Sequence, residues 1–316
     1  MYRIEKYDTK YYTEWNEFIA ASKNGTFLFH RDFMEYHKDR FKDFSLLIFQ
    51  EEKLVAVLPA NIKDNEVHSH QGLTYGGLIY TSKLKQLSVS EIFTKIVAYL
   101  NEEKVKKLYL KQIPIIYHKY PAQESEYALF HMGAKLVRRD GLSVYDKEKP
   151  LAFTKKRKEA IRRGEKNGLI ITEEPRFDLF WNEVLIPNLE RKHEAKPVHS
   201  LKEIEMLYNK FPENIRQFNV YDNDKIVAGT TVFITDTVVK PQYVSATTNK
   251  NELGSLDYLY AKLITEFFSD RRYFDLGPSF GDDRKTINEG VLFWKESFGA
   301  RTIVHDFYEV NIQDTP

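Results

Sequence analysis

One alternation of apolar and polar positions occurs twice along this chain. Apolar and β-branched residues run from Leu46 to Val67, interrupted by the polar stretches EEK and KDNE. A second run, from Phe218 to Val239, is interrupted by DNDK and TDT, and the two segments align without a gap. Strand-like runs separated by polar turns are typical of antiparallel strands. We therefore expect an antiparallel meander in each half of the chain.

A helical pattern follows each meander. Ser88 to Leu100 and Ser255 to Phe268 place apolar residues at helical spacing, and each begins with a residue suited to N-capping. A short strand-like run comes next, and then FHMGAKLVRRDGLSVY in the first half matches ESFGARTIVHDFYEV in the second. The glycines of these motifs, Gly133 and Gly299, can take the left-handed conformation that ends helices. Each half thus predicts a meander, a helix, a strand, a second helix and a last strand.

The repetition predicts a duplicated α/β protein. At 316 residues the chain is long enough for two domains of about 150 residues each. We place them at residues 1–150 and 151–316, as a pseudo-symmetric pair with a cleft between the copies.

Composition narrows the chemistry. The formal net charge is +1, with 47 basic and 46 acidic residues, so any attraction for an anionic partner must be local. With no cysteine, disulfides, thiolate catalysis and Cys-ligated metal sites are excluded. The N-terminal segment lacks the apolar core of a signal peptide, and the longest apolar runs fall far below the roughly 18 residues of a membrane span. These features predict a cytoplasmic protein without a membrane span.

The segment between the copies is strongly basic. It predicts a helix from about Thr154 to Lys166, ended by Asn167 and Gly168. A helix N-terminus already carries positive partial charge, so four cations in its first turn are unfavourable unless something offsets them. An anionic ligand would do so, because backbone N–H groups and flanking cations together bind phosphate. The alternative is a solvated basic face. The cations are Lys155, Lys156, Arg157, Lys158, Arg162, Arg163 and Lys166.

Lys295 differs from its counterpart in the repeat. The alignment of the two second helices places Leu129 of the first half opposite Lys295, so the scaffold accepts an apolar residue at this position. A lysine near an apolar helix end often extends its ammonium to water. The alternative is a cation that stabilises a developing oxyanion or holds a phosphate.

Two other motifs are weaker. GPSFG, around Ser279, matches the G-x-S-x-G pattern of serine hydrolases, but DDRKT follows it where a helix should begin. His68 and His70 would share one face of a strand, yet no third ligand is indicated, so we expect no metal site.

The order of motifs resembles the FemAB-like branch of the GNAT acyltransferases. The resemblance rests on TKKRKEAIRRGEKNGLII, the meander after it, YFDLGPSFGDDRKTINEG, LFWKESFGA, and the N-terminal GTFLFHRDFMEYH and TYGGLIY, and it covers nearly the whole chain. It implies an α/β fold of two tandem GNAT-like domains, each with a mixed, mostly antiparallel sheet and flanking helices.

The resemblance also implies a function, acyl or aminoacyl transfer to an amine of a cell-wall or polysaccharide precursor. It implies an acyl donor that is aminoacyl-tRNA or acyl-CoA, a precursor substrate carrying phosphate, and no tightly bound cofactor. Lys295 would be the lysine of the family's "FK" motif and assist at the tetrahedral intermediate. Strands PQYVSATT and YFDLGPS would splay apart to admit the acyl group. The implied substrate-binding residues are Lys156, Arg157, Arg162, Tyr243, Ser245 and Ser279.

One departure concerns the donor. The pyrophosphate-binding motif of ordinary GNAT proteins should fall near NKNELGSLDYL, where only Gly254 is present, which puts CoA in doubt and favours a tRNA-type donor. The general base is unassigned. Candidates that lie nearby in the sequence are Asp275, Asp282, Asp283 and His305. Three other functions stay open: a non-catalytic module that binds anions or RNA, a CoA-dependent N-acetyltransferase, and a serine hydrolase.

Overall fold

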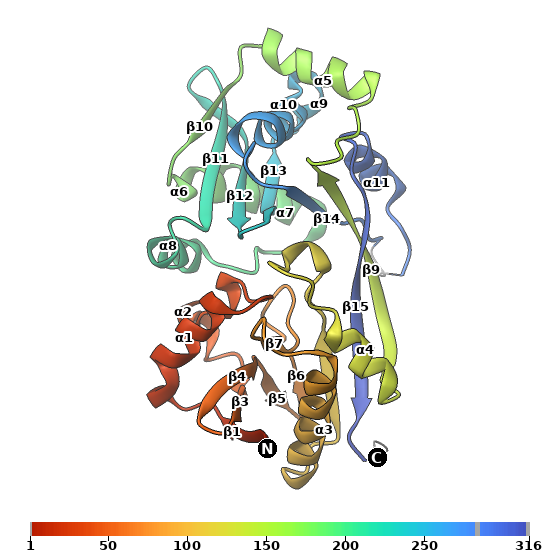
Figure 1. Ribbon diagram of the computed structural model, residues 1–316. Helices are drawn as coiled ribbons and strands as arrows, with labels where there is room; N and C mark the ends of the chain where they lie inside the picture. Colours follow the sequence, from red (N-terminus) through yellow and green to blue (C-terminus); the bar gives the residue numbers. More distant parts are fainter. Residues whose placement is uncertain (1, 282–284, 314–316) are drawn as a thin grey trace. The chain divides into compact units, whose positions relative to one another are not determined.

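The computed structural model describes residues 2–281 and 285–313, and its contacts divide the chain into two compact units. The first unit comprises Met1–Asp140 and Val304–Pro316, and the second comprises Gly141–Ile303. Figure 1 shows the elements of both units in chain order. Within the described residues, no helix combines the length and hydrophobicity needed to cross a bilayer.

Two sheets form the first unit. One is antiparallel, with strands in the order β1 (Tyr2–Lys6), β3 (Leu46–Gln50), β4 (Lys53–Leu58) and β7 (Ile79–Tyr80). The strands of the other follow the order β15 (Arg301–Asn311), β8 (Lys107–Lys111), β6 (Glu66–His68), β5 (Asn61–Lys63) and β2 (Lys42–Asp43). The α-helices are α1 (Tyr12–Ala21), α2 (Arg31–Met34), α3 (Gln86–Glu102) and α4 (Glu124–His131).

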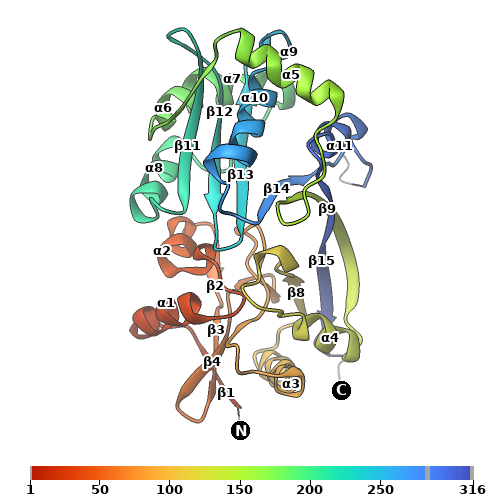
Figure 2. The same cartoon turned by 45° about the horizontal axis from the view of Figure 1, so that its top comes forward.

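The second unit contains one mixed sheet. Its strands follow the order β10 (Ile170–Glu173), β11 (Ile215–Asp222), β12 (Lys225–Ile234), β13 (Val238–Ala246), β14 (Tyr273–Pro278) and the part of β9 (Lys135–Asp146) that follows Asp140. Figure 2 shows α10 on one face of this sheet and α7 on the other. The helical segments are α5 (Lys155–Lys166), α6 (Phe177–Leu179), the π-helix η5 (Phe180–Leu185), α7 (Ile186–His193), α8 (Leu201–Lys210), α9 (Lys250–Leu253), α10 (Ser255–Lys262), the π-helix η6 (Leu263–Phe267) and α11 (Glu289–Glu296).

Each unit has its own apolar core. In the first, the buried face of α3 packs with the strand residues Leu46, Ile48 and Leu108, and the helical spacing of its apolar residues explains why one face is buried. In the second, Leu259 and Leu263 from α10 and η6 pack among apolar residues of the sheet. Burial of these faces is the main stabilising contribution to each unit.

The expected meander is confirmed in the second half and altered in the first. β11, β12 and β13 pair in sequence as antiparallel neighbours. In the first half β3 and β4 pair as expected, but β5 joins β6 in the other sheet. Pro59 directly follows β4 and has no N–H to continue a strand ladder, so the chain leaves the first sheet there.

The last strand of each half pairs outside its own repeat. β9 ends the first half but pairs with β14 in the second unit, where Tyr273 lies opposite Asp146. β15 ends the second half, and its C-terminal part pairs with β8 in the first unit, where Phe307 lies opposite Lys111. The compact units therefore differ in extent from residues 1–150 and 151–316, the domain boundaries that follow the repeat.

Both glycine helix ends are present. Gly133 follows α4 with a φ of 74°, and Gly299 follows α11 with a φ of 83°. This left-handed conformation is accessible to glycine without the steric penalty that a Cβ would add. The expected helix ends in the two halves are thus confirmed.

Candidate functional site

Strands β13 and β14 form the frame of the candidate site. They are parallel neighbours, but only Val238 with Tyr273 and Val239 with Phe274 pair as residues of one ladder. Beyond Val239 the β13 edge facing β14 has no strand pairing among the described residues, although β13 continues to Ala246 on its pairing with β12. Figure 2 shows β14 turning away from β13. The expected divergence of the two strands is therefore present.

Lys295 lies beside the end of β14. Its ammonium donates a hydrogen bond to the carbonyl oxygen of Gly277 at 3.0 Å and another to the carbonyl oxygen of Pro278. The side chain comes from the last turn of α11 and is 7% exposed, so it does not extend to water. An ammonium has three N–H donors, and two of them are used by these carbonyls. No third acceptor for this ammonium lies among the described residues, so one donor is available to a ligand.

A buried ion pair holds the strand end on which Lys295 rests. Lys240 of β13 donates to Asp275 Oδ2 of β14 at 3.0 Å, and Asp275 is 1% exposed. The other carboxylate oxygen of Asp275 accepts from the Gly277 N–H at 2.7 Å, and Gly277 has a φ of 76°. Asp275 thus fixes the turn that presents the two carbonyls to Lys295.

Burial sets the charge state of Lys295. Burial, together with the nearby Lys240, lowers its pKa from 10.5 to about 8, and Asp275 opposes the shift. At pH 7 the ammonium form still predominates. The group is therefore a buried cation that can stabilise negative charge, with a proton that is easier to remove than that of an exposed lysine.

Ser279 follows β14 directly. Its hydroxyl is buried and has no hydrogen-bond partner among the described residues. A nucleophile elbow would need a base at the hydroxyl and a helix after the serine, but the described residues that follow, Phe280 and Gly281, form an isolated bridge and a turn. Serine-nucleophile chemistry has no support from this geometry.

Tyr243 and Ser245, on β13, contact the helical layer on one face of the sheet. The Tyr243 hydroxyl accepts from the His199 backbone N–H at 3.0 Å and bonds to the His199 ring. The Ser245 hydroxyl accepts from Asn188 Nδ2 at 2.9 Å and donates to the Val184 carbonyl at 3.3 Å. Their polar atoms already have protein partners, and substrate contact by either residue stays a prediction.

Arg157 binds α5 to its neighbours. Its guanidinium pairs with Asp257 of α10 and donates to the Ser297 hydroxyl at 2.8 Å, and it lies over the Phe298 ring at 4.7 Å. Burial lowers its pKa to about 10. Asp257 therefore offsets one of the cations at this helix start, and the side chain of Thr154 caps the N-terminus. The guanidinium of Arg157 is already bound by protein groups, and a phosphate contact for this residue stays a prediction.

Lys156 and Arg162 lie on the exposed surface of α5. Lys156 lies over the ring of Phe293 on α11 at 5.8 Å. Arg162 has no ion-pair partner among the described residues. Both cations are therefore accessible to a phosphate, unlike Arg157.

The start of α10 is covered by α5. A Cβ on Gly254, which precedes α10, would lie 2.4 Å from the Ala160 carbonyl oxygen. A Cβ on Gly164 would lie 2.5 Å from the Tyr258 side chain. The two helices thus meet through glycines, and α5 occupies the space beside the N-terminus of α10 where a pyrophosphate would need exposed N–H groups.

The histidines do not form the expected pair. His68 ends β6 and stacks on Tyr109, whereas His70 lies beyond the strand with a φ of 55° and stacks on His37. A left-handed residue breaks the alternation of a strand, so the two rings have different surroundings. Among residues 2–281 and 285–313, no group of three or more His, Asp or Glu is placed to hold a metal ion.

The structure places two of the four candidates for the general base. Asp275 is engaged by Lys240 and Gly277, and His305 lies in the first unit. Asp282 and Asp283 lie outside the described residues. The general base therefore stays unassigned.

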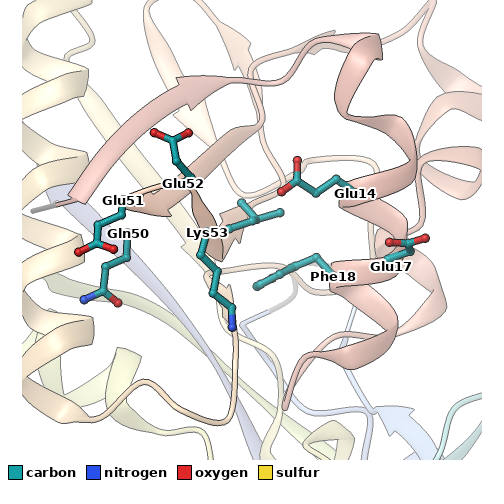
Figure 3. Close-up of a pocket in the computed structure, with 8 residues that line it drawn as sticks. Glu14, Glu17, Phe18, Gln50, Glu51, Glu52 and Lys53 are labelled. Carbon is teal, nitrogen blue, oxygen red and sulfur yellow. The ribbon is translucent and has the colours of Figure 1, made fainter.

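A separate pocket lies in the first unit, with a cavity volume of about 550 Å³. Figure 3 shows side chains from α1 and from the turn between β3 and β4 around it. Phe18 and Leu54 form its apolar part, and four exposed carboxylates surround them, those of Glu14, Glu17, Glu51 and Glu52. None of the residues predicted for catalysis or binding lines this pocket.

Two residues of the site gave no sequence signal. Lys240 is followed by Pro241 in a strand with a bulge, and its contact with Asp275 depends on the pairing of two strands that are distant in sequence. Asp257 is an ordinary first-turn carboxylate of α10 until Arg157 reaches it from α5. The internal repeat could have identified neither, because both are set by contacts between elements.

Comparison with solved structures identifies the fold. The chain is similar to FemX, with a TM-score of 0.69 at 10% identity, over 98% of this chain and 97% of that one. It is similar to L-PGS from Bacillus licheniformis, with a TM-score of 0.57 at 11% identity, over 84% and 83%. A tandem GNAT protein from the clavulanic acid biosynthesis pathway matches with a TM-score of 0.51 at 10% identity over the full length of both. The chain therefore has a FemAB-like double-GNAT fold.

No protein-family model matches the sequence, and a search of curated proteins gives no match. The likeness is therefore one of fold.

Proposed function

We propose that this protein transfers an acyl or aminoacyl group to an amine, with the chemistry at the diverging ends of β13 and β14. The observation that carries the proposal is the buried ammonium of Lys295, bound to the Gly277 and Pro278 carbonyls. It lies near the edge of β13 that, within the described residues, has no strand pairing beyond Val239. The FemAB-like fold supports it, because the resemblance implies acyl transfer to an amine of a cell-wall precursor.

The proposed reaction is aminolysis. A neutral amine attacks the carbonyl carbon of the donor ester, and a C–N bond forms as the C–O bond to the donor breaks. The amine loses a proton, and the leaving oxygen gains one. Negative charge develops on the carbonyl oxygen in the tetrahedral intermediate, and a fixed cation in a buried environment stabilises it. Lys295 would supply that cation, and backbone N–H groups on the free edge of β13 would assist it.

An aminoacyl-tRNA is the donor we favour. The close contact of α5 with Gly254 and Tyr258 leaves little room for a pyrophosphate at the start of α10. Lys156 and Arg162 are exposed and can contact phosphates of a donor or an acceptor. Acetyl-CoA is the second candidate, because the tandem GNAT protein of similar fold is named as a form without AcCoA.

The test compares donors directly. The protein would be incubated with amine-bearing cell-wall precursors and either tRNA charged with radiolabelled amino acids or radiolabelled acetyl-CoA. We expect label to pass from tRNA to a base-stable amide product, and only when acceptor is present. Label that moves from acetyl-CoA alone would overturn the choice of donor. Tight tRNA binding without any transfer would support the RNA-binding module and overturn the proposed activity.

A further inference from the structure

The outward face of α5 is strongly cationic. Arg157, Ala160 and Gly164 form its buried face, while six cations are exposed against the two carboxylates Glu159 and Glu165. Lys155 and Lys166 lie opposite Arg157 at the helical spacing of 100° per residue, and so point away from the unit. The exposed cations are Lys155, Lys156, Lys158, Arg162, Arg163 and Lys166.

Exposed apolar side chains flank the start of this face. Phe293 on α11 is 56% exposed and lies under the ammonium of Lys156 at 5.8 Å. Leu151 is 44% exposed and precedes α5 in a segment whose Thr154 N–H donates to the Ser297 carbonyl at 3.0 Å. Both views show the start of α5 next to α11 (Figures 1 and 2).

This surface is rigidly assembled. The Arg157 contacts with Asp257 and Ser297 fix α5 to α10 and to the end of α11. A Cβ on Gly299 would lie 2.4 Å from the Leu151 carbonyl oxygen, so the segment before α5 packs closely on the end of α11. The cations and the apolar side chains therefore belong to one surface of the second unit.

We propose that the α5 face, with Phe293 and Leu151, docks on the surface of an anionic lipid bilayer. Cations beside exposed apolar side chains are a composition that binds such a surface, because lipid phosphates attract the cations while apolar groups enter the acyl boundary. A nucleic acid would use the cations equally and could stack a base on Phe293, but the aliphatic Leu151 offers no ring for stacking, whereas a bilayer accepts both apolar side chains.

This docking goes beyond the proposed transfer activity and does not depend on it. Bilayer binding is measured without any donor, so its failure would leave the transfer chemistry untouched. Conversely, a protein that binds vesicles but transfers nothing would leave this inference intact.

The experiment is co-sedimentation of the full chain with phosphatidylcholine vesicles, with and without phosphatidylglycerol. We expect binding only when phosphatidylglycerol is present. Replacing Lys155→Gln together with Lys166→Gln should lower the partition coefficient about 25-fold, at about fivefold for each cation. Phe293→Ser should lower it roughly tenfold or more, because one aromatic side chain no longer leaves water.

Matched controls lie on the first unit. Lys83 and Lys85 are exposed lysines just before α3, and Leu87 within α3 is 85% exposed. Lys83→Gln with Lys85→Gln, and Leu87→Ser, should bind vesicles as the unaltered chain does. Circular dichroism would check that every variant is folded.

Three results would overturn the inference. The first is no binding to phosphatidylglycerol vesicles. The second is a loss of binding in the first-unit controls as large as that in the α5 and Phe293 variants. The third is that Phe293→Ser binds vesicles as the unaltered chain does, while the double lysine variant keeps its vesicle binding and loses only its binding of tRNA. That result would assign the cations to RNA.

Discussion

The second helices of the two halves, α4 and α11, end alike but carry different residues at one matching buried position. Each ends at a left-handed glycine and leads into a long strand, β9 or β15. Leu129 of α4 is fully buried in the apolar core of the first unit. Lys295, at the matching position of α11, is almost as buried but is bound to two carbonyls. The same frame therefore holds a core residue in one unit and a cation in the other.

The two units also differ in how completely their parallel strands pair. In the first unit every residue of β6 pairs with β8, from Glu66 with Lys107 to His68 with Tyr109. In the second unit the pairing of β13 with β14 ends at Val239, and the strands diverge beyond it. Where the sheet closes, the matching helix position is apolar; where it opens, the position is a lysine. This correlation supports a site in the second unit.

The largest expected effect comes from moving the cation into the closed unit. Leu129→Lys would place an ammonium in an apolar core without the carbonyls that Lys295 has. We expect it to lower the free energy of unfolding by about 3 to 5 kcal/mol, measured by urea denaturation. Leu129→Met, which keeps the volume, should cost less than about 1.5 kcal/mol. Equal stability of Leu129→Lys and the unaltered chain would show that the two positions are interchangeable.

A smaller effect should separate the two glycines. Both have a positive φ, so alanine at either costs about 1 kcal/mol of backbone strain. A Cβ at Gly133 meets nothing within 4 Å, whereas one at Gly299 would lie 2.4 Å from the Leu151 carbonyl oxygen. We expect Gly299→Ala to lower the unfolding free energy by about 2 kcal/mol more than Gly133→Ala. Identical losses would contradict the tight packing at the end of α11.

The smallest effect is a pH dependence. Burial lowers the pKa of Lys295 to about 8 from 10.5, so between these values the unfolded chain binds more protons than the folded one. Stability of the unaltered chain should therefore rise with pH in this window relative to Lys295→Leu, by on the order of 1 to 2 kcal/mol. Urea denaturation of both proteins at pH 7 and pH 10 measures the difference. A constant difference would mean that burial does not penalise the ammonium.

Much of this comparison is visible in the sequence. The repeat predicts the meander of the second half, the helices, the glycine ends and the contrast of Leu129 with Lys295. It does not predict that β9 and β15 pair outside their own halves, because strand partners are chosen by tertiary packing. It also groups Arg157 with the exposed cations, although its spacing from Ala160 and Gly164 places it on the buried face.

The site residues illustrate the same limit. Lys295 is found by an internal difference between two copies of one motif. Lys240 and Asp275 become a pair only when β13 and β14 lie side by side, and nothing local in either strand indicates it. Sequence periodicity reports which face of an element is buried, whereas ion pairs between elements require the fold.

The central claim is that the ammonium of Lys295 stabilises the transition state of acyl transfer. Lys111 in the first unit is the matched control, because its ammonium also donates to two backbone carbonyls, those of Gln71 and Leu73, and burial lowers its pKa to about 8. The direct test is single-turnover transfer from aminoacyl-tRNA to amine by the unaltered chain, Lys295→Met and Lys111→Met. Lys295→Met should lower the rate about 100- to 1,000-fold with donor binding unchanged, and Lys111→Met should not. Transfer by Lys295→Met at the unaltered rate, or an equal loss in Lys111→Met, would contradict the claim.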